Sequence, residues 1–179
     1  MLKTVMRSGD TVKGLKDLCL TIDEKIGGKI TIVEIGSYMG ESAEIFAEEF
    51  PDAKIYCIDP WKGGFDDNDT CSHADYNEVE NQFDLRTKDY PNIIKVKDFS
   101  TNVNIPCDMV YIDGRHFYEG VKEDILHWLP LTKKVICGHD FLQTPVPSSH
   151  INGVQQAVRE ILGEPDKVFS ETSWLKWKK

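Results

Sequence analysis

The fold of this chain is decided by residues 32–42, which read Ile32-Val33-Glu34-Ile35-Gly36-Ser37-Tyr38-Met39-Gly40-Glu41-Ser42. The stretch begins with a β-branched apolar run that ends beside an acid, and it then passes through two glycines into a helical pattern. A strand, a glycine turn and a helix in this order are typical of folds that cradle a nucleotide. We therefore predict a small-molecule cofactor site here. The structural alternative is that the glycines only permit a tight turn and close packing of the helix.

The glycine spacing bears on the kind of cofactor. A dinucleotide site needs G-x-G-x-x-G, because the backbone must approach a pyrophosphate at the helix N-terminus. Only Gly36 and Gly40 are present, with Ser37 directly after the first. Glu34 would repel a pyrophosphate but could hold an ammonium group through charge-assisted hydrogen bonds. S-adenosylmethionine carries such an ammonium group and no phosphate, so it is the predicted cofactor.

Length and charge limit the possible functions. A chain of 179 residues suffices for one well-buried domain, which we expect to span 1–179 with an N-terminal helix or lid over 1–28. The net charge of −9 argues against sequence-independent nucleic-acid binding, which needs clustered lysine and arginine. The basic tail of Lys176, Lys178 and Lys179 surrounds Trp177 and is read as a solvated terminal strand. We expect a small-molecule acceptor as partner. The sequence leaves open whether the protein forms homo-oligomers.

The five cysteines show no metal-ligand spacing, and most of them lie in apolar segments. This pattern predicts reduced, buried thiols and a cytoplasmic protein. Cys71 is the exception, because it lies in a polar loop. We see no apolar run of signal-peptide length and none that could span a membrane, so no membrane association is expected.

Strands and helices are predicted to alternate, which implies a parallel sheet. The predicted strands are residues 29–35, 53–58, 92–97, 107–112 and 134–137, followed by a hairpin of 167–170 and 173–177. The predicted helices include residues 15–26, 43–50, 76–88, 117–129 and 154–162. The loop 59–75 is rich in Gly and Asp and interrupts the pattern. Since it follows the carboxyl end of a strand, we expect it to form a flap over the site.

Two further groups at strand ends could contact a cofactor. Asp59 follows the second strand, near the distance from Gly36 at which an acid reaches a ribose hydroxyl pair, although it could also cap the turn before Pro60. Trp61 could cover an adenine face or pack under the flap. Asp98 and Phe99 end the third strand and could flank the adenine.

The fourth and fifth strands end in residues suited to metal and proton chemistry. Asp113 and His116 follow the fourth strand, and His139 and Asp140 follow the fifth. If the two strands are neighbours, their ends lie about 4.8 Å apart, so Asp113, His139 and Asp140 could share one Mg²⁺ ion. His116 would then lie beside the metal and take a proton from an acceptor hydroxyl. Alternatively, Asp113 could cap the helix that begins near Phe117.

Together, four segments resemble the class I S-adenosylmethionine-dependent methyltransferases. They are residues 33–42, 58–61, 111–121 and 138–141. The likeness is strongest to the subgroup of metal-dependent macrolide-sugar O-methyltransferases and cephalosporin hydroxylase-like proteins. One departure is His139, which stands where relatives carry an acid before the second metal-binding aspartate.

The resemblance implies an α/β fold: a doubly wound, Rossmann-like three-layer sandwich around a seven-stranded, mostly parallel sheet with a reversed last strand. It also implies that Glu34 and Gly36 meet the methionine part of the cofactor, Asp59 meets the ribose, Asp113 and Asp140 hold the metal, and His116 is the base. The full set of residues that we assign to cofactor binding is Glu34, Gly36, Ser37, Gly40, Ser42, Asp59, Trp61, Asp98, Phe99 and Asp113.

The predicted function is O-methylation of a small hydroxylated acceptor, such as a sugar or a glycosylated metabolite. N-methylation remains an alternative, because fold-level resemblance does not identify the acceptor atom. A second alternative is a protein that binds S-adenosylmethionine without transferase activity. A nicotinamide-dependent oxidoreductase is disfavoured by the missing middle glycine.

Overall fold

A seven-stranded sheet forms the centre of the computed structural model, which describes residues 3–65, 67, 69–149 and 151–179. The strand order is β3-β2-β1-β4-β5-β7-β6. Strands β1 to β5 run parallel, β7 is antiparallel to both β5 and β6, and the predicted sheet with a reversed strand is therefore confirmed. The strands are β1 Thr31–Ile35, β2 Lys54–Ile58, β3 Ile93–Val96, β4 Cys107–Ile112, β5 Thr132–Gly138, β6 Lys167–Val168 and β7 Trp174–Trp177.

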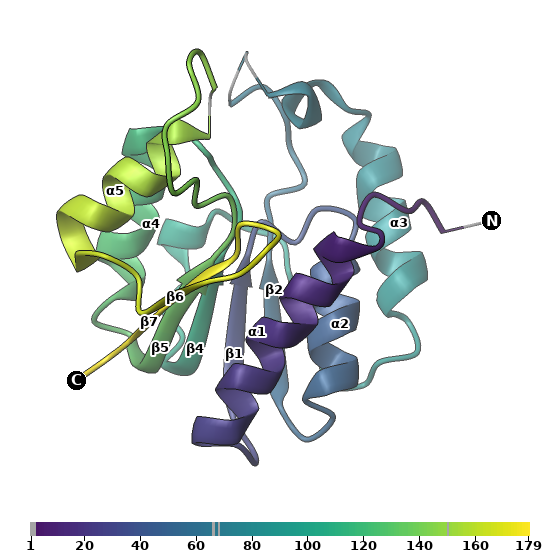
Figure 1. Ribbon diagram of the computed structural model, residues 1–179. Helices are drawn as coiled ribbons and strands as arrows, with labels where there is room; N and C mark the ends of the chain where they lie inside the picture. Colours follow the sequence, from purple (N-terminus) through teal and green to yellow (C-terminus); the bar gives the residue numbers. More distant parts are fainter. Residues whose placement is uncertain (1–2, 66, 68, 150) are drawn as a thin grey trace.

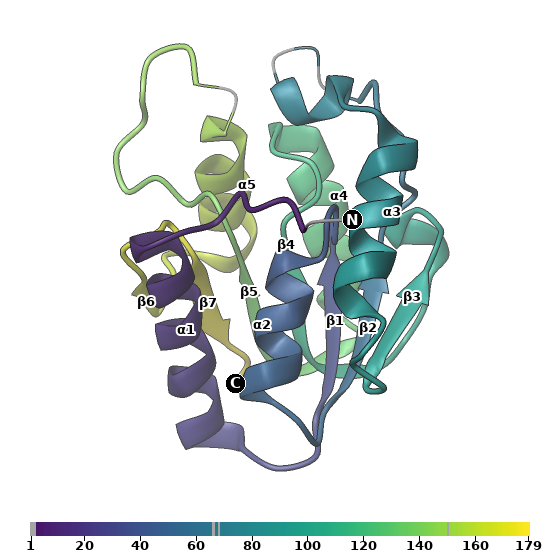
Figure 2. The same ribbon diagram turned by 90° about the vertical axis from the view of Figure 1, so that its right-hand side faces the viewer.

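Helices cover both faces of this sheet, as Figures 1 and 2 show. The helices are α1 Asp10–Ile26, α2 Glu41–Glu49, α3 Tyr76–Thr87, α4 Tyr118–Trp128 and α5 Asn152–Leu162, with short 3₁₀ turns η1 Thr70–His73 and η2 Ser100–Asn102. One apolar core joins α1, α2 and α3 to the sheet, and a second joins α4 and α5 to the opposite face. The predicted three-layer arrangement is confirmed.

Alternation along β1 shows why both faces need helices. Ile32 lies in the first core, whereas Val33 and Ile35 lie in the second, since successive side chains of a strand point to opposite faces. A strand that is apolar on both sides is stable only between two layers. Glu34 is the polar exception in β1, and it is fully buried on the face of the first core.

The predicted hairpin forms, but β6 is shorter than expected. The amide of Phe169 donates to Ser173 O (2.8 Å) and the amide of Thr172 donates to Phe169 O (3.1 Å), so the turn already begins at Phe169. The loop 59–75 contains η1 at Thr70–His73. Asp66 and Asn68 of that loop, and His150 in the segment between β5 and α5, lie outside the described residues.

Residues 3–9, here called the N-terminal strap, cross from the start of α1 over α2 toward α3 (Figure 2). Polar contacts hold this segment: Lys3 pairs with Glu44 of α2 (2.6 Å), and the amide of Thr4 donates to Gln82 of α3 (2.9 Å). Arg86 of α3 also donates to the carbonyl of Thr4. The strap therefore ties three helices together near one end of the sheet.

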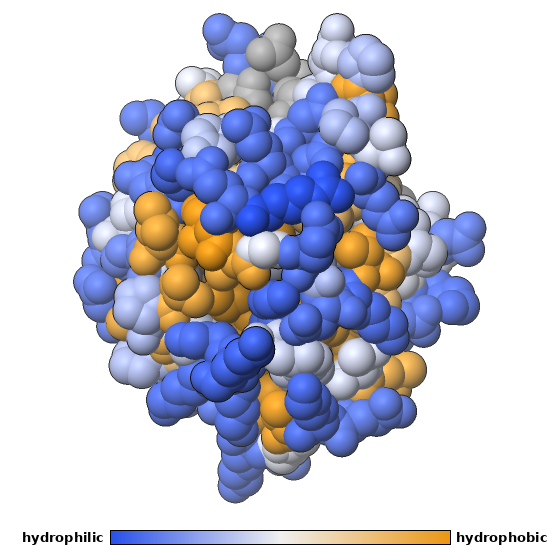
Figure 3. Space-filling model, turned by 60° about the vertical axis from the view of Figure 1, so that its left-hand side comes forward, coloured by the Kyte–Doolittle hydropathy of each residue, from blue (hydrophilic) through white to orange (hydrophobic). Residues whose placement is uncertain are grey.

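On the face shown in Figure 3, hydrophilic residues cover most of the surface and hydrophobic residues form smaller patches. Among the described residues, no helix combines the length and the apolar character that crossing a membrane requires. All five cysteines are free thiols, and all except Cys71 are buried, as predicted. Apolar side chains and thiols therefore concentrate in the two cores.

Candidate active site

A cavity of about 440 Å³ opens above the carboxyl ends of β1 and β4. The chain proceeds from β1 outward to β3 and then returns to β4 on the other side of β1, so this is the point at which the strand order reverses. Ligands of open α/β sheets bind at such a point, and the volume lies in the range of small-molecule sites. The cavity therefore coincides with the cofactor site predicted from residues 32–42.

Gly36 joins three strand ends at the floor of this cavity. Its amide donates to the carbonyl of Ile58 (2.9 Å), and the amide of Asp113 donates to Ile35 O (2.9 Å). A Cβ atom at Gly36 would lie only 2.2 Å from the carbonyl oxygen of Asp113, and φ is +84°. Both the turn and the close approach of β4 require glycine here.

Glu34 lies beneath the cavity rather than in its wall. Its side chain is fully buried. Burial raises the pKa of Glu34, although nearby hydroxyls of Ser37 and Ser42 and the Cys57 thiol oppose the rise. A buried carboxylate is costly to ionise, so a cationic group in the cavity above would favour the charged form of Glu34. This arrangement fits the ammonium group of S-adenosylmethionine.

Ser37, Ser42 and Asp59 line the cavity as predicted. Asp59 accepts hydrogen bonds from the amides of Tyr38 (2.9 Å) and Trp61 (2.6 Å). Burial raises the pKa of Asp59, while these two hydrogen bonds oppose the rise. The turn-capping interpretation of Asp59 is thus confirmed. Each carboxylate oxygen can accept a second hydrogen bond, and contact with a ribose stays a prediction.

Trp61 belongs to the core, which corrects its assignment to cofactor binding. Its ring packs against Phe83 (centroids 4.8 Å apart), its indole N–H donates to Tyr38 O (2.9 Å), and only 5% of the residue is exposed. A local turn accompanies this packing: the Trp61 amide donates to Asp59 Oδ1, and φ of Trp61 is +43°.

Asp98 and Gly40 also lie outside the cavity wall. Asp98 Oδ1 accepts from the Phe99 amide and from Asn102 Nδ2, both at 2.7 Å, so it holds the local turn around η2. Gly40 precedes α2 and packs toward Phe83. Phe99 does line the cavity, and its ring contacts that of Phe65 from the flap (centroids 5.7 Å apart). The flap therefore reaches the mouth of the cavity.

The predicted metal group assembles at the other end of the cavity. Strands β4 and β5 are parallel neighbours, and Ile112 pairs with Gly138, so Asp113 and the pair His139-Asp140 leave the sheet side by side. One ligand atom from each of Asp113, His139 and Asp140 lies within 4.8 Å of the others. Two carboxylates and an imidazole form a donor set that fits a divalent cation. Asp113 does not cap α4, whose first turn has no side-chain cap.

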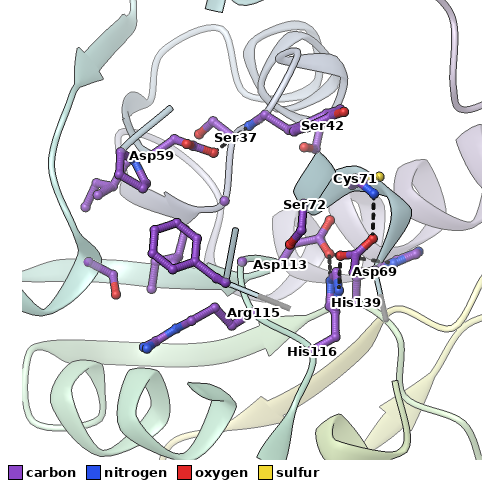
Figure 4. A pocket seen from close by; sticks show the side chains of 18 of the residues that line it. Ser37, Ser42, Asp59, Asp69, Cys71, Ser72, Asp113, Arg115, His116 and His139 are labelled. Carbon is purple, nitrogen blue, oxygen red and sulfur yellow. Dashed lines mark hydrogen bonds and ion pairs between the residues drawn. The ribbon is translucent and has the colours of Figure 1, made fainter. Parts of the chain in front are cut away.

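His116 points into the same cluster, as Figure 4 shows. Its Nε2 lies 3.3 Å from Asp140 Oδ2 and 3.5 Å from Asp113 Oδ1. Burial alone would lower the pKa of His116, but the hydrogen bonds of Asp113 and Asp69 and the charge of Asp140 raise it to about 11. A histidine ordinarily titrates near neutrality, and the three surrounding carboxylates explain why the pKa of His116 is higher.

Two residues of the cluster were missed in the sequence. Asp69 of the flap places Oδ2 at 3.3 Å from His116 Nδ1, and Arg7 of the strap donates to Asp113 Oδ2 (2.7 Å). Nη1 of Arg7 also contacts Nε2 of His139 (3.2 Å). Neither residue belongs to a motif, and each is distant in sequence from its partners. The only available signal was the position of Asp69 in the predicted flap.

Comparisons with known proteins agree with this geometry. A family model described as "Methyltransferase domain" matches residues 33–141. Similar solved structures include a Staphylococcus aureus protein provisionally described as a caffeoyl-CoA O-methyltransferase (16% identity, 98% of this chain and 85% of that one, TM-score 0.66). The O-methyltransferase NovP (14%, 94% and 78%, 0.63) and the calicheamicin methyltransferase CalS11 (14%, 93% and 77%, 0.61) have the same fold.

One curated relative, the uncharacterized protein y4gI of Sinorhizobium fredii, is 25% identical over 123 residues. The match covers 61% of this chain and 13% of that protein. The family match spans the glycine turn, Asp59, Asp113, His116 and both residues after β5, whereas Arg7 of the strap lies outside it. This chain therefore belongs to the methyltransferase-domain family, and its domain is a class I S-adenosylmethionine-dependent methyltransferase domain.

Proposed function

We propose that this protein transfers the methyl group of S-adenosylmethionine to an oxygen of a small hydroxylated acceptor, such as a sugar or a glycosylated metabolite. The observation that carries the proposal is the cluster of His116, Asp113 and Asp140, which shares one cavity with the glycine turn at Gly36. The groups that we propose as base and as cation ligands thus lie beside the expected position of the methyl donor.

The two ends of the cavity suit the two substrates. The end near Gly36, Ser37 and Asp59 would hold the cofactor above the buried Glu34 carboxylate. The other end is bounded by the strap, by the flap and by the cluster, and its walls include Met6, Thr11 and Ser72. An acceptor in this chamber could place a hydroxyl near both His116 and the donor methyl group, as an in-line transfer requires.

The transfer forms a bond between the acceptor oxygen and the methyl carbon and breaks the bond between that carbon and the cofactor sulfur. The acceptor proton would pass to Nε2 of His116. Asp113, His139 and Asp140 would hold a divalent cation such as Mg²⁺, which when bound supplies positive charge to the developing alkoxide. A cation on Asp113 and Asp140 would also offset two of the three carboxylates that raise the pKa of His116, which would favour its action as a base.

The net charge and one solved structure support this class of acceptor. The net charge of −9 disfavours nucleic acid as the acceptor. One solved structure of this fold, CalS11, is described as a TDP-rhamnose 3′-O-methyltransferase, which is an example of a sugar acceptor. Transfer to nitrogen remains the second candidate, because a base beside the methyl donor serves an amine as well.

The test is formation of S-adenosylhomocysteine with a panel of sugars, glycosylated metabolites and matched amines, with and without Mg²⁺. We expect turnover with a hydroxylated member and none with its O-methylated counterpart. Tight S-adenosylhomocysteine binding without turnover on any member would favour a binding protein. Thermal stabilisation by NAD but not by S-adenosylhomocysteine would contradict the proposal.

A further inference from the structure

Arg7 places a positive charge against the residues that would hold a cation. Its Nη2 donates to Asp113 Oδ2 at 2.7 Å, and its Nη1 lies 3.2 Å from Nε2 of His139. The Arg7 side chain is 17% exposed and that of Asp113 is 11% exposed, so water screens their attraction only weakly. A fixed positive charge of the protein therefore lies against two of the three candidate ligands.

The contact also determines the hydrogen on His139. A guanidinium group can only donate, so Nε2 of His139 must accept with its lone pair. The ring proton then resides on Nδ1, which faces Asp140 Oδ1 at 3.1 Å. With Arg7 in this position, both nitrogens of His139 are used, and neither is available to bind a metal.

The backbone around Arg7 shows that this position is built into the fold. The amides of Met6 and Arg7 donate to the two carboxylate oxygens of Glu41, at 2.7 and 2.9 Å. Glu41 begins α2, directly after the glycine turn. The same strap segment contributes Met6 and Arg7 to the cavity wall, so the position of Arg7 and the closure of the acceptor chamber are coupled.

We infer that Arg7 is an internal competitor of the divalent cation: the strap closes the chamber with Arg7 on Asp113 and His139, and cation binding releases it. The inference rests on the proposed cation site. Two positive groups cannot share the Asp113 and His139 donor atoms at contact distance in a site with little water. Binding of the cation and opening of the strap therefore occur together.

Mn²⁺ binding tests the competition without an acceptor, by electron paramagnetic resonance or calorimetry. We expect Arg7→Gln and Arg7→Ala to bind Mn²⁺ at least about tenfold more tightly than the unchanged protein, because one competing charge is gone. Arg7→Lys should bind Mn²⁺ with an affinity between that of these two variants and that of the unchanged protein. Lys3→Ala loosens the outer end of the strap without touching the cluster, so its affinity should stay within about threefold. Asp113→Asn should remove binding.

Trypsin gives a second readout, because it cleaves after Arg7 only when this side chain leaves the cluster. Mn²⁺ should speed cleavage of the Arg7–Ser8 bond relative to cleavage after the exposed Lys29, and mass spectrometry identifies the products. Equal Mn²⁺ affinity in Arg7→Gln and the unchanged protein would overturn the inference. A rate of cleavage after Arg7 that Mn²⁺ does not change would overturn it as well.

Absence of Mn²⁺ binding in every variant would also overturn the inference, together with the cation site on which it rests. S-adenosylhomocysteine binding by the same samples separates this result from failure of the proposed methyl transfer. If that ligand binds normally, only the cation part is lost; if it does not bind, the proposed function itself fails.

Discussion

Asp69 Oδ2 lies 3.3 Å from Nδ1 of His116, while Nε2 of the same ring faces Asp113 and Asp140. The flap therefore contacts the candidate base on the side opposite the expected acceptor. A carboxylate at Nδ1 fixes the orientation of an imidazole and favours a proton on that nitrogen, so that Nε2 can accept another. The flap therefore helps to orient His116.

Replacing His116 by alanine should abolish methyl transfer and leave S-adenosylhomocysteine affinity within about threefold, because the base acts on the acceptor. His73→Ala is the matched control. His73 belongs to the same flap, and its Nε2 contacts the carbonyl of Asp67 (3.3 Å) rather than the cluster. Calorimetry and a turnover assay check both variants, and a large loss of cofactor affinity in His116→Ala would argue against its role as base.

Asp69→Asn should reduce turnover by about 10- to 100-fold through misorientation of His116, with little change in the KM of the acceptor. An asparagine retains the acceptor that caps η1, where Asp69 Oδ1 accepts from the Cys71 amide (2.8 Å). Asp75→Asn is the control, since Asp75 caps α3 in the same way without meeting His116. Similar losses in both variants would assign Asp69 a structural role only.

Chelation should stop turnover, and added Mg²⁺ should restore it, if Asp113, His139 and Asp140 hold the cation. Asp140→Asn should weaken Mn²⁺ binding by at least about tenfold, since one anionic ligand is lost. Asp108→Asn, which removes an acid of β4 that pairs with Lys134 far from the cluster, should bind normally. Full activity in excess chelator would remove the cation from the reaction.

Gly36→Ala should lower the free energy of unfolding by more than the ~1–2 kcal/mol cost of a left-handed backbone alone, and should abolish S-adenosylhomocysteine binding. Gly28→Ala offers a close comparison. Its φ is +82°, similar to +84° at Gly36, but a Cβ atom there meets nothing within 4 Å. Chemical denaturation measures both variants, and equal losses would show that contact with Asp113 adds nothing.

Glu44 should stabilise the fold only above acidic pH. Burial raises the pKa of Glu44, but the hydrogen bonds and charges of Lys3 and Arg86 outweigh it and hold the pKa below its usual value of 4.5. A lowered pKa contributes stability that is present above the usual value and is lost as pH falls through the lowered one. The difference in unfolding free energy from Glu44→Gln should therefore be largest near neutrality and vanish in acid.

The control for this pH dependence is Glu48→Gln, which alters a more exposed glutamate of the same helix, 3.7 Å from Lys16. Its unfolding free energy should change little between pH 7 and pH 3, because exposed pairs contribute little. A pH dependence equal to that of Glu44→Gln would mean that the strap contacts do not stabilise the fold.

The sequence determined most of the architecture, because alternating apolar strands and amphipathic helices carry local signals. Ile32, Val33 and Ile35 show that both faces of β1 are buried, and Gly36 marks a turn that no other residue fits. Parallel pairing then brings Asp113 and Asp140 together, since the carboxyl ends of neighbouring strands share one edge.

Only the tertiary structure decided which residues contact the cluster and which predicted site residues lie outside the cavity. Arg7 and Asp69 reach Asp113 and His116 from segments that have no periodic pattern, and their approach depends on where the strap and the flap pack. Trp61 packs against Phe83 in the core, where the Asp59 carboxylate holds its amide. Periodicity specifies a residue's neighbours within an element, whereas contacts between distant loops follow from packing of the whole chain, and these contacts set the charge at the candidate base.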